Sequence, residues 1–344
     1  MFSLFTRHRP TTALINGVSV GVYPKETLLQ AALRHGIDFP HSCRVGGCAS
    51  CKCKLVSGSV RELTETGYIL SDEELDAGYI LACQSVPRGD VHIEVDLARQ
   101  PSRRQVRGKV VAQDRLTHDI TRLVIQLEES LAYRAGQYAD LSLDSLPRLR
   151  RSFSFASPAQ PDAQVSFFVR RVPGGVFTGV VNDRPLLGHG VTVEGPLGDF
   201  HLRAADAPLL LIAGGSGLAP LLAMLQDAVA NGVSRPVTLL FGARQARDLY
   251  ALEDISAIAT QWRGSFSFVP VLSEAAADAA WRGERGLVTA QIPALLPPGA
   301  HAYLCGPPAM IDSAITLLRE AGVPREHIHA DRFTTLQDVL PTSA

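Results

Sequence analysis

The sequence predicts a multidomain protein with three folds in succession: a small α+β domain, an antiparallel β-barrel and an α/β domain with a parallel sheet. A cysteine-rich and glycine-rich loop from His41 to Cys53 lies among short strands and one helix. Between Val106 and Arg203, six short strands are separated by turn residues, which indicates a barrel. From Pro208 onward, apolar strands alternate with helices, which indicates a parallel sheet covered on both faces.

The first domain begins with an alternating pattern around Asn16-Gly17. This pair predicts a hairpin because both residues tolerate a positive φ. A helix is predicted over Thr27–His35, followed by the cysteine-rich loop and further short strands. We place this domain at residues 1–97 and a linker at 98–105, where the chain is polar, contains Pro101 and lacks periodicity.

The second domain is predicted at residues 106–204 and the third at 205–333, followed by a tail at 334–344. The candidate barrel strands are Val106–Ala112, Ile120–Leu127, Gln137–Leu143, Ser152–Ala156, Val165–Val169 and Val191–Glu194. The candidate strands of the third domain are Leu209–Ala213, Val237–Gly242, Phe266–Leu272 and His301–Cys305. Its candidate helices are Leu218–Ala230, Leu252–Thr260 and Ala309–Ala321.

Four cysteines have the spacing of plant-type iron–sulfur ligands. Cys43, Cys48 and Cys51 follow the pattern C-x4-C-x2-C, and Cys83 lies far downstream. Two irons bridged by sulfides need four converging thiolates, and Gly46-Gly47 lets the backbone approach the sulfurs closely. A zinc site or buried free cysteines are the alternatives, but zinc ribbons use paired CxxC knuckles. We therefore predict a [2Fe–2S] cluster on these four cysteines.

The segments His41–Cys51 and Leu81–Gln84 resemble the cluster loops of ferredoxin domains that are fused to NAD(P)H-dependent reductase components of bacterial oxygenases. The resemblance extends from about Thr12 to Phe333. It implies a β-grasp ferredoxin domain followed by the FAD-binding barrel and the nucleotide-binding α/β domain of ferredoxin–NADP reductases. Cys53 lies outside the ligand pattern, and we expect it to pack in the core.

The FAD site is predicted from the segment Arg151–Ser154, which resembles the R-x-[YF]-[ST] signature of the ferredoxin–NADP reductase family. By this resemblance, Arg151 pairs with the flavin pyrophosphate, Phe153 packs on the isoalloxazine ring and Ser154 supplies a hydroxyl group near the ring edge. FMN is the alternative to FAD. The resemblance implies six further flavin contacts: Phe168, Val169, Arg170, Gly175, Val176 and Thr178. The last three lie at the start of a helix, where backbone N–H groups receive the phosphates.

A glycine-rich loop between a predicted strand and a predicted helix indicates a pyridine-nucleotide site. Its glycines allow a tight turn and the close approach of a pyrophosphate to the helix N-terminus. The loop resembles the family's G-G-[TS]-G-[ILV]-[AT]-P motif. The expected contacts are Gly214, Gly215, Ser216, Gly217 and Pro220.

Two motifs near the end of the chain complete the predicted active site. Cys305-Gly306-Pro307 resembles the C-G-P-x-x-M motif, whose thiol lies near the nicotinamide carbon that donates hydride, and Gly306 and Pro307 are expected nucleotide contacts. Asp331-Arg332-Phe333 resembles the [ED]-x-F motif, in which the aromatic ring covers the flavin until nicotinamide displaces it. A packed core cysteine is the alternative for Cys305. The catalytic candidates are Cys305, Ser154, Phe333 and Asp331.

The sequence leaves the choice between NADH and NADPH open. Asp248 could bind a ribose 2′-hydroxyl and repel a 2′-phosphate, whereas Arg244 or Arg247 could pair with that phosphate. Solvated surface charges are the alternative for each of these residues. The resemblance to oxygenase reductases favours NADH.

The predicted activity is NAD(P)H-dependent oxidoreduction, in which electrons pass from NADH to FAD, then to the [2Fe–2S] cluster, and finally to a protein acceptor. The resemblance implies a Rieske-type or di-iron oxygenase as this acceptor. One alternative is a reductase for a deoxysugar-forming iron–sulfur dehydrase. Another is a non-catalytic electron carrier or redox sensor that keeps the ferredoxin domain.

Composition limits the partners and the compartment. The net charge of −1, with scattered Lys and Arg, is not that of a protein that binds nucleic acid or an anionic membrane. The most apolar stretch, Pro208–Leu225, is interrupted by Gly214–Gly217, so we expect no membrane span. Met1–Pro10 lacks the apolar core of a signal peptide. We expect a cytoplasmic monomer.

Overall fold

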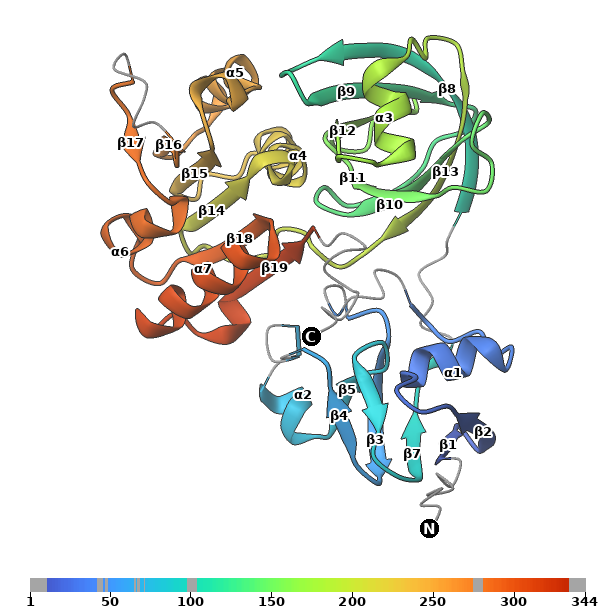
Figure 1. The fold of residues 1–344 in the computed structure, drawn as a ribbon. Helices are drawn as coiled ribbons and strands as arrows, with labels where there is room; N and C mark the ends of the chain where they lie inside the picture. Colours follow the sequence, from blue (N-terminus) through green and yellow to red (C-terminus); the bar gives the residue numbers. More distant parts are fainter. Residues whose placement is uncertain are drawn as a thin grey trace, which may run out of the picture. The chain divides into compact units, whose positions relative to one another are not determined.

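The computed structural model describes residues 11–41, 46, 49–64, 66, 69–70, 72–97, 104–274 and 281–333. The chain divides into two compact units, residues 1–100 and 101–344, and the division falls within the predicted linker. Figure 1 shows the elements of both units. The predicted fold class is confirmed, because the described residues form a β-grasp domain, an antiparallel barrel and a parallel sheet.

The first unit is built on a mixed sheet of five strands in its described part, in the order β2-β1-β7-β3-β5. The strands are β1 (Thr11–Ile15), β2 (Val18–Val22), β3 (Lys52–Ser57), β5 (Tyr79–Leu81) and β7 (Val91–Glu94). Strands β4 (Val60–Glu62) and β6 (Ser85–Pro87) form a separate antiparallel pair. The parallel pairing of β1 with β7, between antiparallel neighbours, gives the β-grasp arrangement.

Local sequence explains the start of this unit. Asn16 and Gly17 have φ values of 46° and 84°, which makes the predicted tight turn between β1 and β2. Helix α1 (Leu28–Arg34) begins with a capping box, in which Thr27 accepts from the Gln30 backbone and the Gln30 side chain accepts from Thr27 N. A short helix α2 (Asp72–Asp76) precedes β5.

A six-stranded antiparallel barrel opens the second unit, with strand order β11-β10-β13-β8-β9-β12 in its described residues. The strands are β8 (Arg104–Arg115), β9 (Ile120–Leu127), β10 (Tyr138–Leu143), β11 (Arg151–Ser154), β12 (Gln164–Arg170) and β13 (Gly190–Leu197). The two ends of the sheet meet through an antiparallel bridge between Phe155 and Phe167, which closes the barrel. Helix α3 (Val176–Asp183) lies against β12 and β9.

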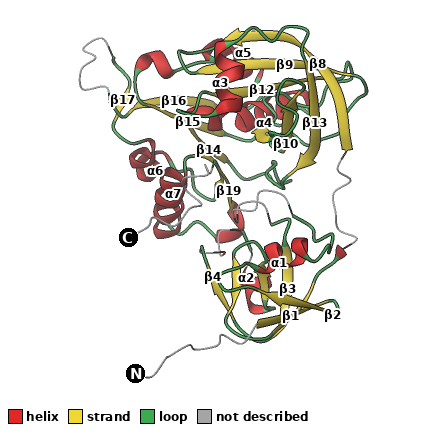
Figure 2. Ribbon diagram, turned by 45° about the vertical axis from the view of Figure 1, so that its right-hand side comes forward, coloured by secondary structure: helices red, strands yellow, loops and turns green. Residues whose placement is uncertain are grey.

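The rest of the second unit is a parallel sheet flanked by helices, as Figure 2 shows in yellow and red. The strand order is β17-β16-β15-β14-β18-β19 in the described residues. The strands are β14 (Leu209–Gly214), β15 (Val237–Ala243), β16 (Phe266–Leu272), β17 (Glu284–Arg285), β18 (His301–Gly306) and β19 (Ile328–Arg332). The main helices are α4 (Leu218–Ala230), α5 (Leu252–Gln261), the short α6 (Ile292–Leu295) and α7 (Pro308–Glu320).

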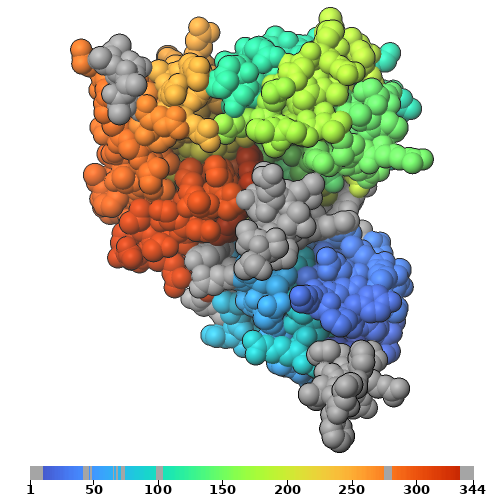
Figure 3. All heavy atoms as spheres, viewed as in Figure 1, coloured from blue at the N-terminus to red at the C-terminus, as the bar shows by residue number. Residues whose placement is uncertain are grey.

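The barrel and the parallel-sheet domain share one hydrophobic core. Phe168 and Phe200 of the barrel side pack in the same buried cluster as Leu211 of β14 and Leu222 of α4. In Figure 3 the green atoms of the barrel lie directly against the yellow and orange atoms of the sheet domain. The first unit has a core of its own, around Ile15, Leu28 and Ile93. No helix in the described ranges is long and apolar enough to cross a membrane.

Candidate functional site

The ends of two neighbouring parallel strands form the centre of the site. β14 pairs in parallel with both β15 and β18. The strands that follow β14 along the chain first extend the sheet on one side, through β15, β16 and β17, and then on the other side, through β18 and β19. Ligands of open α/β sheets bind at the carboxyl ends of the strands at such a reversal point. The carboxyl end of β14 carries Gly214 and that of β18 carries Cys305 and Gly306, so the fold brings the two predicted nucleotide motifs together.

The glycines of this loop are required for backbone packing as well as for ligand approach. A Cβ atom on Gly217 would overlap the carbonyl oxygen of Cys305, and a Cβ on Gly214 would lie 2.6 Å from the Met310 sulfur. Gly306 has a φ of 153°, and a Cβ there would lie 3.1 Å from Gly214 Cα. The loop and β18 are therefore in direct backbone contact, and the Met310 side chain of α7 packs against both. Ser216 is half-buried, while Pro220 is buried in α4.

Cys305 is completely buried next to Asp331, its register partner on β19. Burial raises the pKa of the Cys305 thiol well above its usual range, and the charge of Asp331 acts in the same direction. The sulfur therefore keeps its proton at neutral pH. Pro307, which caps α7, is exposed.

The last described residue, Phe333, is attached to the same strand end. Its backbone N–H donates to the Gly306 carbonyl over 2.9 Å, and its half-buried ring packs against the shared core. The strand β19 that carries Asp331 and leads to Phe333 was not predicted. The tail at 334–344 lies outside the described residues.

Tyr250 is a site residue to which sequence reasoning gave no role. Its hydroxyl group donates to the Gly215 carbonyl over 2.9 Å, and its ring packs edge-on against Phe168 of the barrel and Phe241 of β15. Tyr250 therefore connects the nucleotide loop to the barrel. The only sequence signal was an aromatic residue in the loop after a predicted strand.

Arg170, at the end of β12, reaches from the barrel to the nucleotide loop. Its Nε donates to Asp119 Oδ2 over 2.8 Å, and a Cβ on Gly215 would lie 3.0 Å from its Nη1. Burial alone would raise the pKa of Asp119, but the hydrogen bonds from Arg170 and Thr117 outweigh it and lower that pKa. The guanidinium group of Arg170 therefore lies beside Gly215, in the turn that precedes α4.

The remaining flavin candidates lie on β11 and β12. Arg151 is exposed, Phe153 is half-buried with its ring 5.5 Å from that of Phe177, and Ser154 is buried. Val169 is fully buried in the barrel core, so only its backbone can face a ligand. Phe168 packs on Tyr250.

Helix α3 has an N-terminus without a side-chain cap in the described part of the chain, which is the kind of backbone site that can bind a phosphate. Gly175 is the N-cap, and no side chain of the described residues caps the helix. Thr178 instead accepts from Val172 N over 3.1 Å and donates to the Gly175 carbonyl, which leaves the first-turn N–H groups to a ligand. Val176 is 60% exposed, so this turn is open to solvent.

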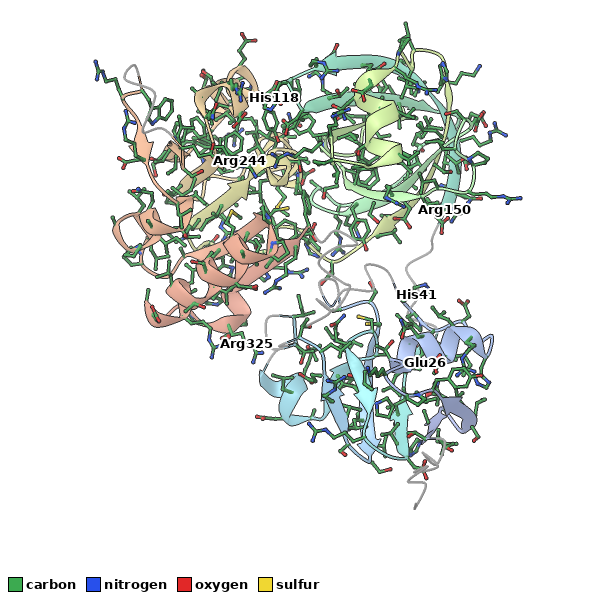
Figure 4. All side chains as sticks on the ribbon, viewed as in Figure 1. Glu26, His41, His118, Arg150, Arg244 and Arg325 are labelled. Atoms are coloured by element: carbon green, nitrogen blue, oxygen red, sulfur yellow. The ribbon has the colours of Figure 1, made fainter. Side chains whose placement is uncertain are left out.

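The loop after β15 carries the charges for which the sequence left the choice of nucleotide open. Asp248 Oδ2 accepts from Gln245 N over 2.9 Å, and Oδ1 lies 3.4 Å from Nδ1 of His118 in the barrel. Arg244 is exposed and pairs with Glu274, at the end of β16, over 3.9 Å. Figure 4 labels His118 and Arg244, which come from the two domains that meet here.

Two of the four predicted cluster ligands are described, and Cys43 and Cys48 lie outside the described residues. Cys51 and Cys83 are 3% and 5% exposed, and the Cys51 carbonyl accepts from Ala82 N over 3.0 Å. The segments that carry them are thus joined. Cys53 is buried in the core, where burial and then the charge of Cys83 raise the pKa of its thiol.

These residues fit the groups that the sequence implies. Cys51 and Cys83 supply two buried thiols on segments that are joined by the hydrogen bond from Ala82 N to the Cys51 carbonyl, and Gly46, in the loop before Cys51, has a φ of 81°. Thiolates are the ligands that iron–sulfur clusters require. The uncapped N–H groups at the start of α3 suit the phosphates of FAD. At α4 the N-cap is Gly217, which has no side-chain hydrogen bond in the described chain, so the N–H groups there suit the phosphates of NAD(P).

Three family models match the chain in the order of its domains. The 2Fe-2S iron-sulfur cluster binding domain matches residues 14–88, the oxidoreductase FAD-binding domain matches 107–202, and the oxidoreductase NAD-binding domain matches 211–315. The predicted cofactors, a [2Fe–2S] cluster, FAD and NAD(P)H, are thereby confirmed.

Relatives with the same three domains are reductase components of oxygenases. The chain is 42% identical over 311 residues to the electron transfer component of the xylene/toluene monooxygenase of Pseudomonas putida, covering 90% of this chain and 89% of that protein. It is 37% identical to the reductase component of phenol 2-monooxygenase of Pseudomonas sp. strain CF600, covering 94% and 93%. The crystal structure of an Amycolatopsis cytochrome P450 reductase matches with a TM-score of 0.70 and 36% identity, covering 94% and 99%.

The chain therefore belongs to the family of iron–sulfur flavoprotein reductases that serve oxygenase systems. It is an NAD(P)H-dependent oxidoreductase that passes electrons through FAD and a [2Fe–2S] cluster to an oxygenase component, as predicted.

Proposed function

We propose that the residues around the ends of β14 and β18 receive the nicotinamide nucleotide, and that those at β11 and α3 hold FAD. The observation that carries this proposal is the backbone contact between the glycine loop and the Cys305–Gly306 strand end. When bound, FAD accepts two electrons from the nucleotide and releases them singly. The α4 N-terminus and Arg170 bind the nucleotide pyrophosphate, the first by its N–H groups and the second by its charge.

In this proposal Cys305 positions the nicotinamide ring by packing. Its thiol keeps a proton and lies in a fully buried position, so it has neither the charge of a nucleophile nor that of a base at neutral pH. Asp331 holds the strand β19 against β18 through their register, and Phe333 covers the same strand end. Ser154, buried on β11, is the hydroxyl donor on the flavin side.

NADH is the proposed nucleotide. Glu274 lies within 3.9 Å of Arg244 and neutralises the cation that would pair with a 2′-phosphate. Asp248 adds a second carboxylate in the same loop. Both negative charges lie after the carboxyl ends of β15 and β16, where the adenosine ribose is expected in such sheets.

The proposed acceptor is a Rieske-type or di-iron oxygenase component, to which the chain docks as a monomer in the cytoplasm. Identities of 42% and 37% to the reductases of two aromatic monooxygenases support an oxygenase of that class. A cytoplasmic site suits thiolate ligands, which need a reducing compartment.

An anaerobic titration of the purified holoprotein with NADH tests the electron route. We expect the flavin absorbance to bleach first and the electron paramagnetic resonance signal of a reduced [2Fe–2S] cluster to follow. NADPH should do the same only at much higher concentration. Equal responses to both nucleotides would contradict the preference for NADH and leave the electron route unchanged.

The Cys51→Ser variant is the control for the order of transfer. It removes a proposed cluster ligand from the first unit and leaves the second unit unchanged. We expect NADH-dependent reduction of ferricyanide to continue and reduction of cytochrome c to fall at least tenfold. Full cytochrome c reduction by this variant would show that electrons leave directly from the flavin.

A further inference from the structure

The side chain of Gln84 lies against Cys83, one of the two described cluster cysteines. It is only 6% exposed, and its Nε2 donates to Cys83 Sγ over 3.6 Å, a normal length for a bond to sulfur. Thr64 Oγ1 donates to the other end of the same amide, Oε1, over 3.1 Å. The amide is thus held at both ends.

Thr64 supports the end of the amide that faces away from the sulfur. A thiolate sulfur only accepts hydrogen bonds, so the NH₂ group of Gln84 faces Cys83, and the Thr64 hydroxyl donates to the carbonyl oxygen at the other end of the amide. The Leu63 N–H donates to the Gln84 carbonyl over 2.8 Å and holds the Thr64 segment beside Gln84. The orientation of the donor is therefore set by the fold of the loop.

The cluster loop is shaped around this side chain. Gly46 has a φ of 81°, and a Cβ atom on it would lie 2.7 Å from Gln84 Cγ and 3.2 Å from Thr64 Oγ1. Glycine at this position leaves the space that the amide fills. Burying a polar side chain costs free energy unless it is hydrogen-bonded, and an apolar side chain would fill the same volume. The hydrogen bond to the Cys83 sulfur explains why a glutamine is buried at this position.

We propose that the amide of Gln84 raises the reduction potential of the [2Fe–2S] cluster by donating a hydrogen bond to the sulfur of Cys83. The proposal rests on the assignment of Cys83 as a ligand. Reduction adds one electron, and the added negative charge is shared with the ligand sulfurs, so an N–H donor stabilises the reduced form more than the oxidised form. No bond to Gln84 forms or breaks. Gln84 is a positioning residue that favours electron arrival from the flavin.

The test is a potentiometric titration of the Gln84→Met variant of the full-length holoprotein. Methionine has a similar length and no N–H donor. The cluster is followed by electron paramagnetic resonance and the flavin by absorbance in the same sample. We expect the cluster potential to become more negative by about 59 mV, which is a tenfold shift for a one-electron couple. The flavin potential should stay unchanged and serves as the internal reference.

Thr64 provides a matched pair of variants. Thr64→Val removes the hydroxyl group that orients the amide and should lower the cluster potential in the same direction, whereas Thr64→Ser keeps it and should leave the potential unchanged. A Gln84→Met protein with a complete cluster and the parent potential would overturn the proposal. Should Gln84→Met fail to retain the cluster, an unchanged potential in Thr64→Val overturns it instead. Absence of the cluster signal from the parent protein would contradict the ligand assignment and not the role of Gln84.

Discussion

Glu274 and Arg244 form an exposed charged pair where the adenosine ribose is expected to bind. The pair is reinforced by the backbone, because Glu274 N donates to the Arg244 carbonyl over 2.8 Å, and by Gln245 Nε2, which donates to Glu274 Oε2 over 3.3 Å. The carboxylate is therefore held beside the guanidinium group. Removing its charge would leave Arg244 to attract a 2′-phosphate.

For Glu274→Gln we predict a shift in nucleotide preference toward NADPH. The ratio of kcat/KM for NADPH to that for NADH should rise about tenfold, which corresponds to about 1.4 kcal/mol. Steady-state ferricyanide reduction with each nucleotide measures this ratio. Glu253→Gln, at an exposed position in the first turn of α5, is the matched control and should leave the ratio unchanged. An unaltered ratio in Glu274→Gln would leave Asp248 as the discriminating carboxylate.

At this scale the sequence predicted motifs better than contacts. The glycine loop and Cys305 lie together as their motifs implied, because short motifs at strand ends are positioned by the sheet itself. Tyr250, Asp119 and Glu274 had no role assigned, since each acts through a partner that is distant in the chain. Asp248 was considered alone, whereas it also faces His118 of the other domain.

Strand β19 brings a group of histidines to the amino-terminal side of the parallel sheet. His329 stacks on Tyr303 of β18 with centroids 4.7 Å apart, and His301 stacks on His327 at 4.0 Å. Burial, and after it the charges of neighbouring groups, lower the pKa of His329 to about 3. These groups are Arg203, His301 and His201, while Asp199 acts in the opposite direction.

The low pKa of His329 makes the second unit sensitive to acid. The folded chain holds this ring neutral, whereas the unfolded chain protonates it below about pH 6.5. The contribution of this ring to the free energy of unfolding is therefore fully present above about pH 6.5, and it is lost as the pH falls from about 6.5 to about 3. Between pH 7 and pH 5 we predict a loss of at most about 2 kcal/mol, measured by urea unfolding followed through tryptophan fluorescence.

His329→Phe keeps a ring for stacking on Tyr303 and removes the titrating group. We expect the stability of this variant to fall less between pH 7 and pH 5 than that of the parent. His189→Phe, at an exposed position, is the control and should keep the parent slope. If His329→Phe and the parent lose equal stability, the acid sensitivity arises from other groups.

Elements with a clear periodic pattern were predicted, and several short ones were missed. The hairpin at Asn16-Gly17, helix α4 and the apolar strand β14 follow strong local signals. β19 alternates buried Ile328 and Ala330 with polar residues over only five positions, which is too short to distinguish from a loop. β4, β6 and β17 have two or three residues each and exist only because a partner strand is present.

For the whole molecule, the order and types of the domains were predictable because each domain carries its own motif. What the sequence did not indicate is that the barrel and the nucleotide-binding domain have a common core. Apolar periodicity identifies a buried face but not the element that covers it. Phe168 and Phe200 therefore appeared as barrel residues, although they pack with residues of the parallel-sheet domain.

The shared core has a thermodynamic consequence. When one domain unfolds, the side chains of the shared core lose their packing in the other domain as well. The barrel and the nucleotide-binding domain should therefore unfold in one cooperative transition, and the ferredoxin domain, which has a separate core, in another. Differential scanning calorimetry of the oxidised holoprotein should then show two heat-absorption peaks for three domains. Excess FAD should move only one of them to higher temperature, and a third peak would mean that the two halves of the reductase unfold independently.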